Sequence, residues 1–278
     1  MNNLLLLILC FIAGVLLRRF KRMPENAPAT LNSFIIHVSL PALTLLYVHE
    51  LKISGDVVLI AAMAWLVFCL AAGFFWLLGR RLRLSRATTG ALMLTGGLGN
   101  TSFFGLPMVE AFYGKDGLST AIIADQLGSF LVLSVVGITV AGIYSSGRPT
   151  AVQIFKRIAL FPPFISLLIA LLLIPLEYAD WFFTLLKRLG DTLAPLALLS
   201  VGMQLRLGHL AEHRRNLALG LGFKLAIQVT LFEAAMPPMI TAAIVASEHD
   251  LDPPLANLMV AVGLLLSFFT LSAWWYVF

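Results

Sequence analysis

Long apolar runs, separated by short charged or Pro/Gly-rich breaks, follow one another along the whole chain. A helix of about 20 apolar residues is long enough to cross a hydrocarbon layer of about 30 Å. The pattern predicts one continuous apolar stretch over 216–247 and single spans over 3–17, 30–49, 56–79, 88–113, 117–144, 159–176, 189–205 and 254–278. We therefore expect an all-α membrane protein that forms one helical bundle without a soluble domain.

Composition and charge support this interpretation. Of the residues, 60% are hydrophobic and 12% are charged, whereas about a quarter of the residues of a soluble domain are charged. The net charge of +5 does not indicate a nucleic-acid partner, because 14 of the 19 Lys and Arg residues lie in alternate loops. These are Arg18, Arg19, Lys21, Arg22, Arg80, Arg81, Arg83, Arg86, Arg148, Lys156, Arg157, Arg206, Arg214 and Arg215. Basic loops stay in the cytoplasm, which predicts an N-terminus outside the plasma membrane.

The fourth span contains an unusual interruption, TGGLGNTSFFGLP at 95–107. Nine of its 13 residues are glycine, proline or small polar residues, which are poor helix formers. Unpaired backbone groups cost several kcal/mol each in hydrocarbon, so this segment should be buried in protein or line a watery cavity. The ends of a broken helix also attract ions, with amides favouring anions and carbonyls favouring cations. We expect a binding site here.

The two halves of the chain repeat the same order of features. Residues 31–51 align with 185–205, which places Pro41 opposite Pro195. The interruption at 95–107 corresponds to a second one in LFEAAMPP, and each leads through a short charged turn to a long span. Interrupted helices at matching positions of two halves indicate a transporter site near the bilayer midplane. We predict two inverted repeats, over 1–144 and 159–278.

Three segments carry a resemblance to a known family: GNTSFFGLPMVEAFYGKDG, ADQLGSF and AAMPPMITAAIVASEHDLD. They resemble the bacterial branch of the auxin efflux carrier family, within the bile acid/sodium symporter superfamily, and the resemblance covers nearly the whole chain. It implies ten helices in two inverted five-helix repeats. The fourth and ninth helices would be unwound and would cross at mid-membrane.

The resemblance also implies a function. Members of the family carry small organic anions, such as dicarboxylates in bacteria or auxin in plants, driven by protons or by membrane potential. Asn100 and Thr101 match the first crossing segment, and Met236 and Pro237 match the second. Spans one, two, six and seven would form a scaffold or dimer face, and the others a core, in a protein of the bacterial inner membrane.

The second half is shorter than the first. From Pro41 to Asn100 the chain advances 59 positions, but from Pro195 to Met236 it advances only 41. The difference of about 18 residues is close to one membrane crossing. Two layouts remain open. Either a short eighth segment dips into the membrane and the C-terminus lies outside, as in a ten-helix layout, or nine helices cross and the C-terminus faces the cytoplasm.

Ionisable side chains within spans are costly in lipid and are therefore candidates for function. Asp125 lies in the fifth span with Gln126 beside it, Glu233 lies just ahead of the second interruption and His37 lies in the second span. We predict that the three ionisable residues couple transport to a proton or another ion. The alternatives are a structural hydrogen bond for Asp125, a membrane-boundary position for Glu233 and a packing role for His37. Lys224 is a fourth candidate, although its long stem can reach the interface.

Polar side chains at the interruptions are the expected substrate contacts. Amide and hydroxyl groups can bind a carboxylate without adding a permanent charge, which favours Asn100, Thr101 and Ser102. In the alternative, these three only cap the ends of half-helices. The complete predicted substrate-binding set is Asn100, Thr101, Ser102, Met236 and Pro237. The predicted structural positions, where helices break or approach closely, are Gly99, Gly105, Pro107, Pro41 and Pro195.

No P-loop, HExxH, CxxC or GxSxG motif occurs, so we expect neither an enzyme nor a cofactor or metal. The leading hypothesis is a secondary transporter of small organic anions, such as malate or auxin-like acids, that works by alternating access. A cation/proton exchanger of similar architecture is one alternative, although it would need an adjacent acidic pair. An intramembrane sensor or enzyme is another. The expected partners are the organic anion, the lipid bilayer, a proton or sodium ion, and a second copy in a homodimer.

Overall fold

The computed structural model describes residues 2–49, 57–105, 109, 113, 118–145, 150–205, 210–227 and 236–277. Within these residues all regular elements are helical, and the strand-like pairing is one isolated bridge between Gly99 and Pro238. The runs Ala27–His49, Val57–Leu82 and Thr120–Tyr144 are long and apolar enough to cross a membrane, and Pro162–Leu173 and Pro253–Ser267 are shorter apolar helices. The predicted all-α membrane protein is confirmed.

The chain folds into two compact units. Unit 1 consists of Met1–Lys52 and Arg157–Leu205, and unit 2 consists of Ile53–Lys156 and Arg206–Phe278. Unit 1 therefore holds the predicted spans one, two, six and seven, and unit 2 holds the others. The predicted grouping of the spans is confirmed.

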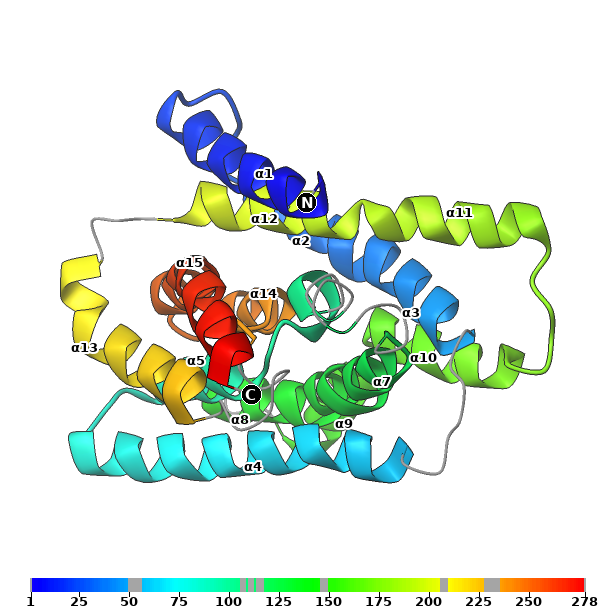
Figure 1. The fold of residues 1–278 in the computed structure, drawn as a ribbon. Coiled ribbons are helices and arrows are strands. Elements are labelled where there is room, and N and C mark those ends of the chain that lie inside the picture. The colour runs from blue at the N-terminus through cyan, green and yellow to red at the C-terminus, as the bar shows by residue number, and fades with distance from the viewer. Residues whose placement is uncertain are drawn as a thin grey trace. The chain divides into compact units, whose positions relative to one another are not determined.

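Unit 1 is built by reciprocal packing of its two halves. Its elements are α1 (Asn2–Arg19), α2 (Ala27–Phe34), η1 (Ile35–Ser39), α3 (Leu40–His49), α10 (Pro162–Leu173), α11 (Asp180–Asp191) and α12 (Leu193–Gln204). The helix α1 runs along α12, and α10 packs against α3 (Figure 1). In each case the first helix of one half contacts the second helical run of the other half.

The contact between α1 and α12 depends on two glycines. A side chain on Gly202 would collide with the backbone of Phe11 and Val15, and one on Gly14 would collide with the carbonyl of Leu199. Glycine lets two helix backbones approach this closely, which is how membrane helices pack without large side chains.

The prolines of unit 1 affect its helices less than expected. The helix continues through Pro41, which follows the π-helical turn η1, and Pro195 lies in the first turn of α12. The seventh span, predicted to begin at 189, begins earlier as α11. Lys187 and Arg188 end the apolar run in the sequence, but both side chains are exposed, so they do not prevent the helix from extending past them.

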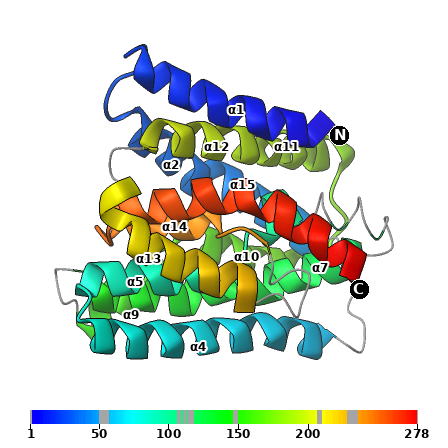
Figure 2. The same ribbon diagram turned by 60° about the vertical axis from the view of Figure 1, so that its left-hand side comes forward.

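Unit 2 contains the interrupted helices. Its elements are α4 (Val57–Leu82), α5 (Arg86–Gly97), η2 (Thr101–Gly105), α7 (Leu118–Ile123), η4 (Ala124–Phe130), η5 (Leu133–Gly137), α8 (Ile138–Tyr144), α13 (Leu210–Gly222), η7 (Phe223–Ile227), α14 (Ile240–Glu248) and α15 (Pro253–Val277). The helix α9 (Ala151–Ala159) spans the boundary between the units. Figure 2 shows α13 and α14 beside α15, in agreement with their contacts.

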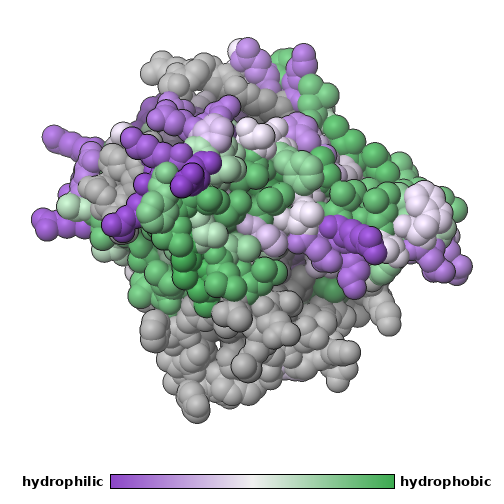
Figure 3. Space-filling view, turned by 90° about the horizontal axis from the view of Figure 1, so that it is seen from above, coloured by the Kyte–Doolittle hydropathy of each residue, from purple (hydrophilic) through white to green (hydrophobic). Residues whose placement is uncertain are grey.

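Much of the surface is apolar. Large hydrophobic side chains are exposed along α1, α4 and α10, for example Leu9, Leu59 and Leu172. Figure 3 shows broad areas of hydrophobic side chains on one face, with hydrophilic ones gathered in clusters beside them. Apolar exposure on this scale is unfavourable in water. It is expected where helices face lipid.

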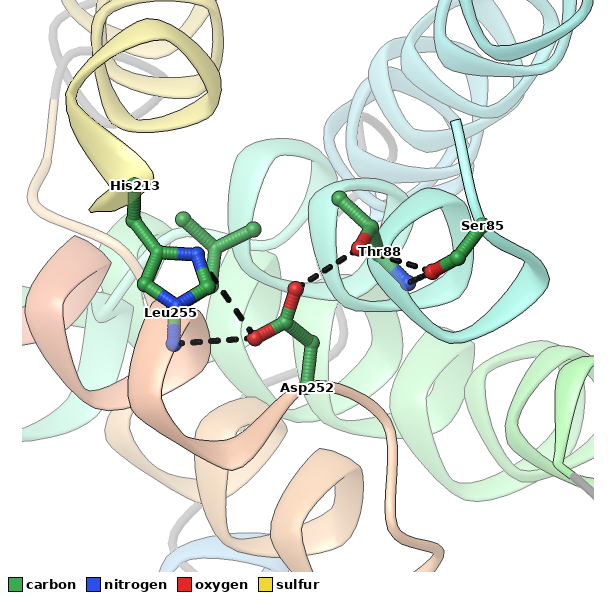
Figure 4. A network of polar contacts seen from close by, with 5 residues as sticks. All are labelled: Ser85, Thr88, His213, Asp252 and Leu255. Atoms are coloured by element: carbon green, nitrogen blue, oxygen red, sulfur yellow. Dashed lines mark hydrogen bonds and ion pairs between the residues drawn. The ribbon is translucent and has the colours of Figure 1, made fainter. Parts of the chain in front are cut away.

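A polar network at one end of unit 2 ties three helices together (Figure 4). The Thr88 hydroxyl at the start of α5 donates to Asp252 Oδ2 at 2.7 Å. Asp252 Oδ1 accepts from the Leu255 amide of α15 at 3.4 Å and lies 3.8 Å from His213 Nδ1 of α13. Ser85 caps α5 by accepting from the Thr88 amide at 3.0 Å. The starts of α5, α13 and α15 therefore lie at the same end.

This network distinguishes the two layouts left open by the sequence. The helix α14 ends at Glu248, four residues before Asp252, so it also ends where α13 begins. The described parts of the chain from 210 to 252, which are 210–227 and 236–252, therefore begin and end at the same end of unit 2. Nine full crossings would place the starts of α13 and α15 at opposite ends. The described residues therefore agree with the ten-helix layout better than with nine crossings.

Candidate functional site

The two interruptions meet inside unit 2. The α5 helix ends at Gly97, and Leu98 is extended, with φ −103° and ψ 130°. The Asn100 amide donates to the Pro237 carbonyl at 2.8 Å, and the Met239 amide donates to the Leu98 carbonyl at 3.0 Å. The two segments thus pair in antiparallel fashion around the isolated Gly99–Pro238 bridge. The predicted crossing of the broken helices is present.

These two bonds explain how unwound backbone is tolerated at this depth. Leu98, Asn100 and Met236 are each at most 2% exposed, so their backbone groups are shielded from solvent. A buried amide or carbonyl without a partner costs about 1–3 kcal/mol. Each segment supplies the donor or acceptor that the other lacks.

A buried carboxylate lies beside the crossing. Asp125 is 0% exposed, and its Oδ1 accepts from the hydroxyls of Thr101 at 2.5 Å and Ser102 at 2.6 Å. Its Oδ2 accepts from Gln126 Nε2 at 2.7 Å. Three donors on one carboxylate satisfy an ionised group well. The hydroxyls predicted to contact substrate thus contact the predicted coupling carboxylate.

The remaining predicted residues occupy different places. Met236 is fully buried, and its Cε would lie 3.8 Å from a Cβ on Gly105. His37 is an exposed residue of unit 1 whose Nδ1 lies 2.8 Å from the Ser33 carbonyl. Glu233 and Pro107 lie outside the described residues.

The chemically active side chains of unit 2 share a type of backbone. Thr101 and Ser102 lie on η2, Asp125 on η4 and Lys224 on η7, and all three elements are π-helical. Single π-helical turns inside α-helices occur frequently at functional sites. This shared feature links residues that are far apart in the sequence.

Sequence reasoning missed part of the site. The sequence shows Gln126 only as a neighbour of Asp125, yet its side chain contacts the carboxylate directly. Leu98 and Met239 pair through their backbone atoms. Their apolar side chains give no indication of this pairing in the sequence. Two adjacent polar residues, Asp125 and Gln126, within an apolar run were the sequence feature that could have indicated a role for Gln126.

Comparison with known proteins identifies the class. A family described as membrane transport protein matches residues 1–275. The chain is 27% identical over 298 residues to an uncharacterized transporter of Methanothermobacter thermautotrophicus, covering 98% of this chain and 96% of that protein. It is 28% identical over 214 residues to an uncharacterized transporter of Methanocaldococcus jannaschii, covering 74% and 68%.

Fold, crossing and relatives together define a multi-pass membrane transport protein. The chain belongs to the auxin efflux carrier family, as the residue resemblance indicated. Both relatives are archaeal, so the placement in a bacterial inner membrane stays a prediction.

Proposed function

We propose that this protein is a secondary transporter of small organic anions that carry a carboxylate, and that it moves them by alternating access rather than acting as an enzyme. The observation that carries the proposal is the pairing of two broken helices, through Asn100 with Pro237 and Met239 with Leu98, beside a buried polar cluster. Broken helices that present their ends at mid-membrane are how such transporters hold charged substrates.

In this proposal the substrate binds at the crossing. Helix ends there offer backbone amides, and Asn100, Thr101 and Ser102 add neutral polar groups next to the buried surfaces of Met236 and Pro237. Backbone amides and neutral side chains can bind a carboxylate without adding a permanent charge of their own. Thr101 and Ser102 also contact Asp125, so substrate binding and the state of this carboxyl would be linked.

Asp125 would carry the coupling proton. As a carboxylate it accepts three hydrogen bonds, but a protonated carboxyl becomes a donor and needs an acceptor. Gln126 Oε1 is buried without a hydrogen-bond partner among the described residues. Rotation of the Gln126 amide would present this oxygen to the protonated carboxyl. The pair can therefore satisfy both protonation states within the same site.

The packing of unit 1 supports the predicted inverted repeats over 1–144 and 159–278. In that unit α1 contacts α12 while α10 contacts α3, as expected when two equivalent halves exchange their first helices. Alternating access in transporters with such repeats moves one group of helices against another. The division of the chain into two units supplies two such groups.

The C-terminus is expected on the same side of the membrane as the N-terminus, opposite the basic loops. Thr88 follows the basic segment at 80–86, and it bonds to Asp252 just before the final helix, α15. Because 25 residues of helix span about 37 Å, α15 then crosses to the other side. An alkaline phosphatase fusion at the C-terminus should be active, and a green fluorescent protein fusion there should be dark.

A fusion placed after Arg22 is the control for this topology test and should give the opposite result, since it would report a basic loop. Fluorescence from the C-terminal fusion, without phosphatase activity, would mean nine crossings and would contradict the dipping eighth segment.

The substrate contacts predict a transport defect. In proteoliposomes the double variant Asn100→Ala, Thr101→Ala should take up labelled malate with a KM raised about fivefold or more, because it loses two groups that each contribute about 0.5–1.5 kcal/mol. Thr139→Ala is the matched control, since among the described residues the Thr139 hydroxyl donates to the Val135 carbonyl, four residues earlier in the same helical run, at 2.7 Å.

Related monocarboxylates and dicarboxylates should be assayed in parallel, because the structure identifies the carboxylate class and not one acid. Equal KM values for wild type and the double variant would remove Asn100 and Thr101 from the site. Absence of saturable uptake of every carboxylate by the wild type would overturn the proposed function itself.

A further inference from the structure

Lys224 is a buried charged residue that the site described above does not use. It lies on η7 and is 1% exposed, among the largest fully buried side chains of the described residues. Among these residues its ammonium forms neither an ion pair nor a hydrogen bond. Burying an ammonium without a partner is strongly unfavourable. The side chain therefore does not snorkel to an interface, and its position needs a reason.

One side of η7 adjoins the first broken helix. The ring of Phe223, next to Lys224, packs 4.7 Å from Phe74 and 5.1 Å from Phe75, measured between centroids. Phe75 in turn covers Gly96, where an added Cβ would lie 2.5 Å from its ring. Gly96 belongs to the TGGLGN segment that opens the crossing.

The preceding turn of the same helix adjoins the second broken segment. Leu221, three residues before Lys224, and Pro238 of the crossing both contact the space beside Gly263. Residues three apart lie on the same helix face. The neighbours of Lys224 on this helix thus adjoin both interruptions, and η7 itself contacts α5 and α15.

Among the residues that the structure describes, unit 2 consequently buries one acidic and one basic side chain, Asp125 and Lys224. Asp125 has three donors, whereas Lys224 has no anionic partner among the described residues. Ionisable groups inside a membrane protein typically line a substrate or ion pathway. An anion that enters the crossing would supply the missing partner.

We propose that Lys224 is the cation that pairs with a carboxylate of the transported anion, and that it gives the site its preference for anions over neutral analogues. This inference rests on the proposed function. It adds a fixed positive charge to the neutral contacts from Asn100, Thr101 and Ser102. A transported dicarboxylate would place one carboxylate at Lys224 and the other at the crossing.

The test uses ligand-dependent thermal stability of the detergent-solubilised full chain. Malate should raise the melting temperature of the wild type in a saturable manner, and its neutral diamide should not. In Lys224→Met, which keeps the length of the stem, the malate concentration for half-maximal stabilisation should rise about tenfold or more, as for loss of a charge-assisted hydrogen bond. Lys224→Arg should restore part of the response.

The ligand-free melting temperature separates this role from a structural one. Lys224→Met should melt at the same temperature as the wild type or higher, because an unpaired buried charge is removed. A structural lysine would give a lower value. Lys156→Met is the matched control, since Lys156 is exposed on α9, and it should change neither quantity. Lys224→Gln provides a second neutral variant, and loss of folded protein in both neutral variants would overturn the proposal.

Two failures can be told apart. If malate stabilises the wild type and Lys224→Met with half-maximal concentrations within about twofold, the role of Lys224 is wrong while carboxylate binding stands. If no carboxylate of the panel stabilises or is taken up by the wild type, the proposed function fails, and the role of Lys224 fails with it.

Discussion

Asp125→Asn should abolish accumulation driven by a pH gradient while leaving substrate exchange intact. With the membrane potential clamped at zero, one coupled proton per substrate gives about tenfold accumulation for each unit of pH gradient, because one unit corresponds to about 1.4 kcal/mol. At a gradient of two units the wild type should accumulate labelled malate about 100-fold, and the variant should only equilibrate it.

The physical reason lies in the surroundings of the carboxylate. The substituted asparagine would keep the size of the Asp125 side chain and its contacts to Thr101 and Ser102, because an amide oxygen still accepts from hydroxyls. An amide cannot bind and release a proton near neutral pH. The binding step therefore survives, and only the link to the proton gradient is lost.

The measurement needs potassium and valinomycin to fix the potential, and empty liposomes to subtract passive entry. Exchange of internal unlabelled malate for external labelled malate reports whether the variant still transports. Thr139→Ala, in the same helical span, should behave like the wild type. Accumulation by Asp125→Asn equal to that of the wild type would exclude Asp125 as the proton carrier.

The sequence predicts the fold well because the membrane limits the choices. Apolar length identifies helices such as α4 and α15 directly, since a chain in lipid must satisfy its backbone within helices. The interruption at Gly96 to Gly105 is also recognisable, because so many poor helix formers at that depth require burial inside protein. Apolar length and the number of poor helix formers depend on residue type alone, so both can be read from the sequence.

What the sequence leaves open depends on contacts between distant residues. The pattern of apolar runs is the same for nine crossings and for a dipping segment, and only contacts such as those of Asp252 with Thr88 and His213 distinguish them. The sequence predicts a break at Pro41, but a π-helical turn precedes this proline and the helix continues. Contacts with neighbouring helices decide whether a helix breaks or turns back, and the order of residue types alone does not give these contacts.

The same limit applies to the site. A carboxylate in an apolar run is conspicuous, which identifies Asp125, but its bonds to two hydroxyls of another span appear only in the fold. From sequence Lys224 is the weaker candidate, because a lysine can extend to the interface. Its nearly complete burial in the structure makes it the stronger one.

Met239→Pro should reduce transport more severely than any loss of the Met239 side chain, because it removes one of the two backbone bonds that hold the crossing. The Met239 amide donates to the Leu98 carbonyl at 3.0 Å, and proline has no amide hydrogen. The leftover buried carbonyl costs about 1–3 kcal/mol, which corresponds to a loss of between about fivefold and 150-fold in the population of the paired crossing.

Position 239 suits this substitution because its backbone already has the geometry of proline. Met239 has φ −65° and ψ 124° and precedes the first turn of α14, where proline is tolerated. Pro238 lies in the bridge, which is the extended geometry that a following proline requires. The change therefore fits the backbone dihedrals of residue 239, but the proline ring carbon takes the place of the amide hydrogen and pushes the Leu98 carbonyl away, so the hydrogen bond is lost and the two segments separate at this point.

Met239→Ala is the matched control, since it removes the buried side chain but keeps the amide. Uptake of labelled malate should fall between about fivefold and 150-fold from Met239→Ala to Met239→Pro, while gel filtration shows that both variants remain folded. Equal uptake by the two variants would mean that the paired backbone is not needed in the transport cycle. A selective loss in Met239→Pro would show that the backbone pairing of the two segments, rather than the side chains around it, holds the broken helices together. It would also show that this pairing must stay intact during transport.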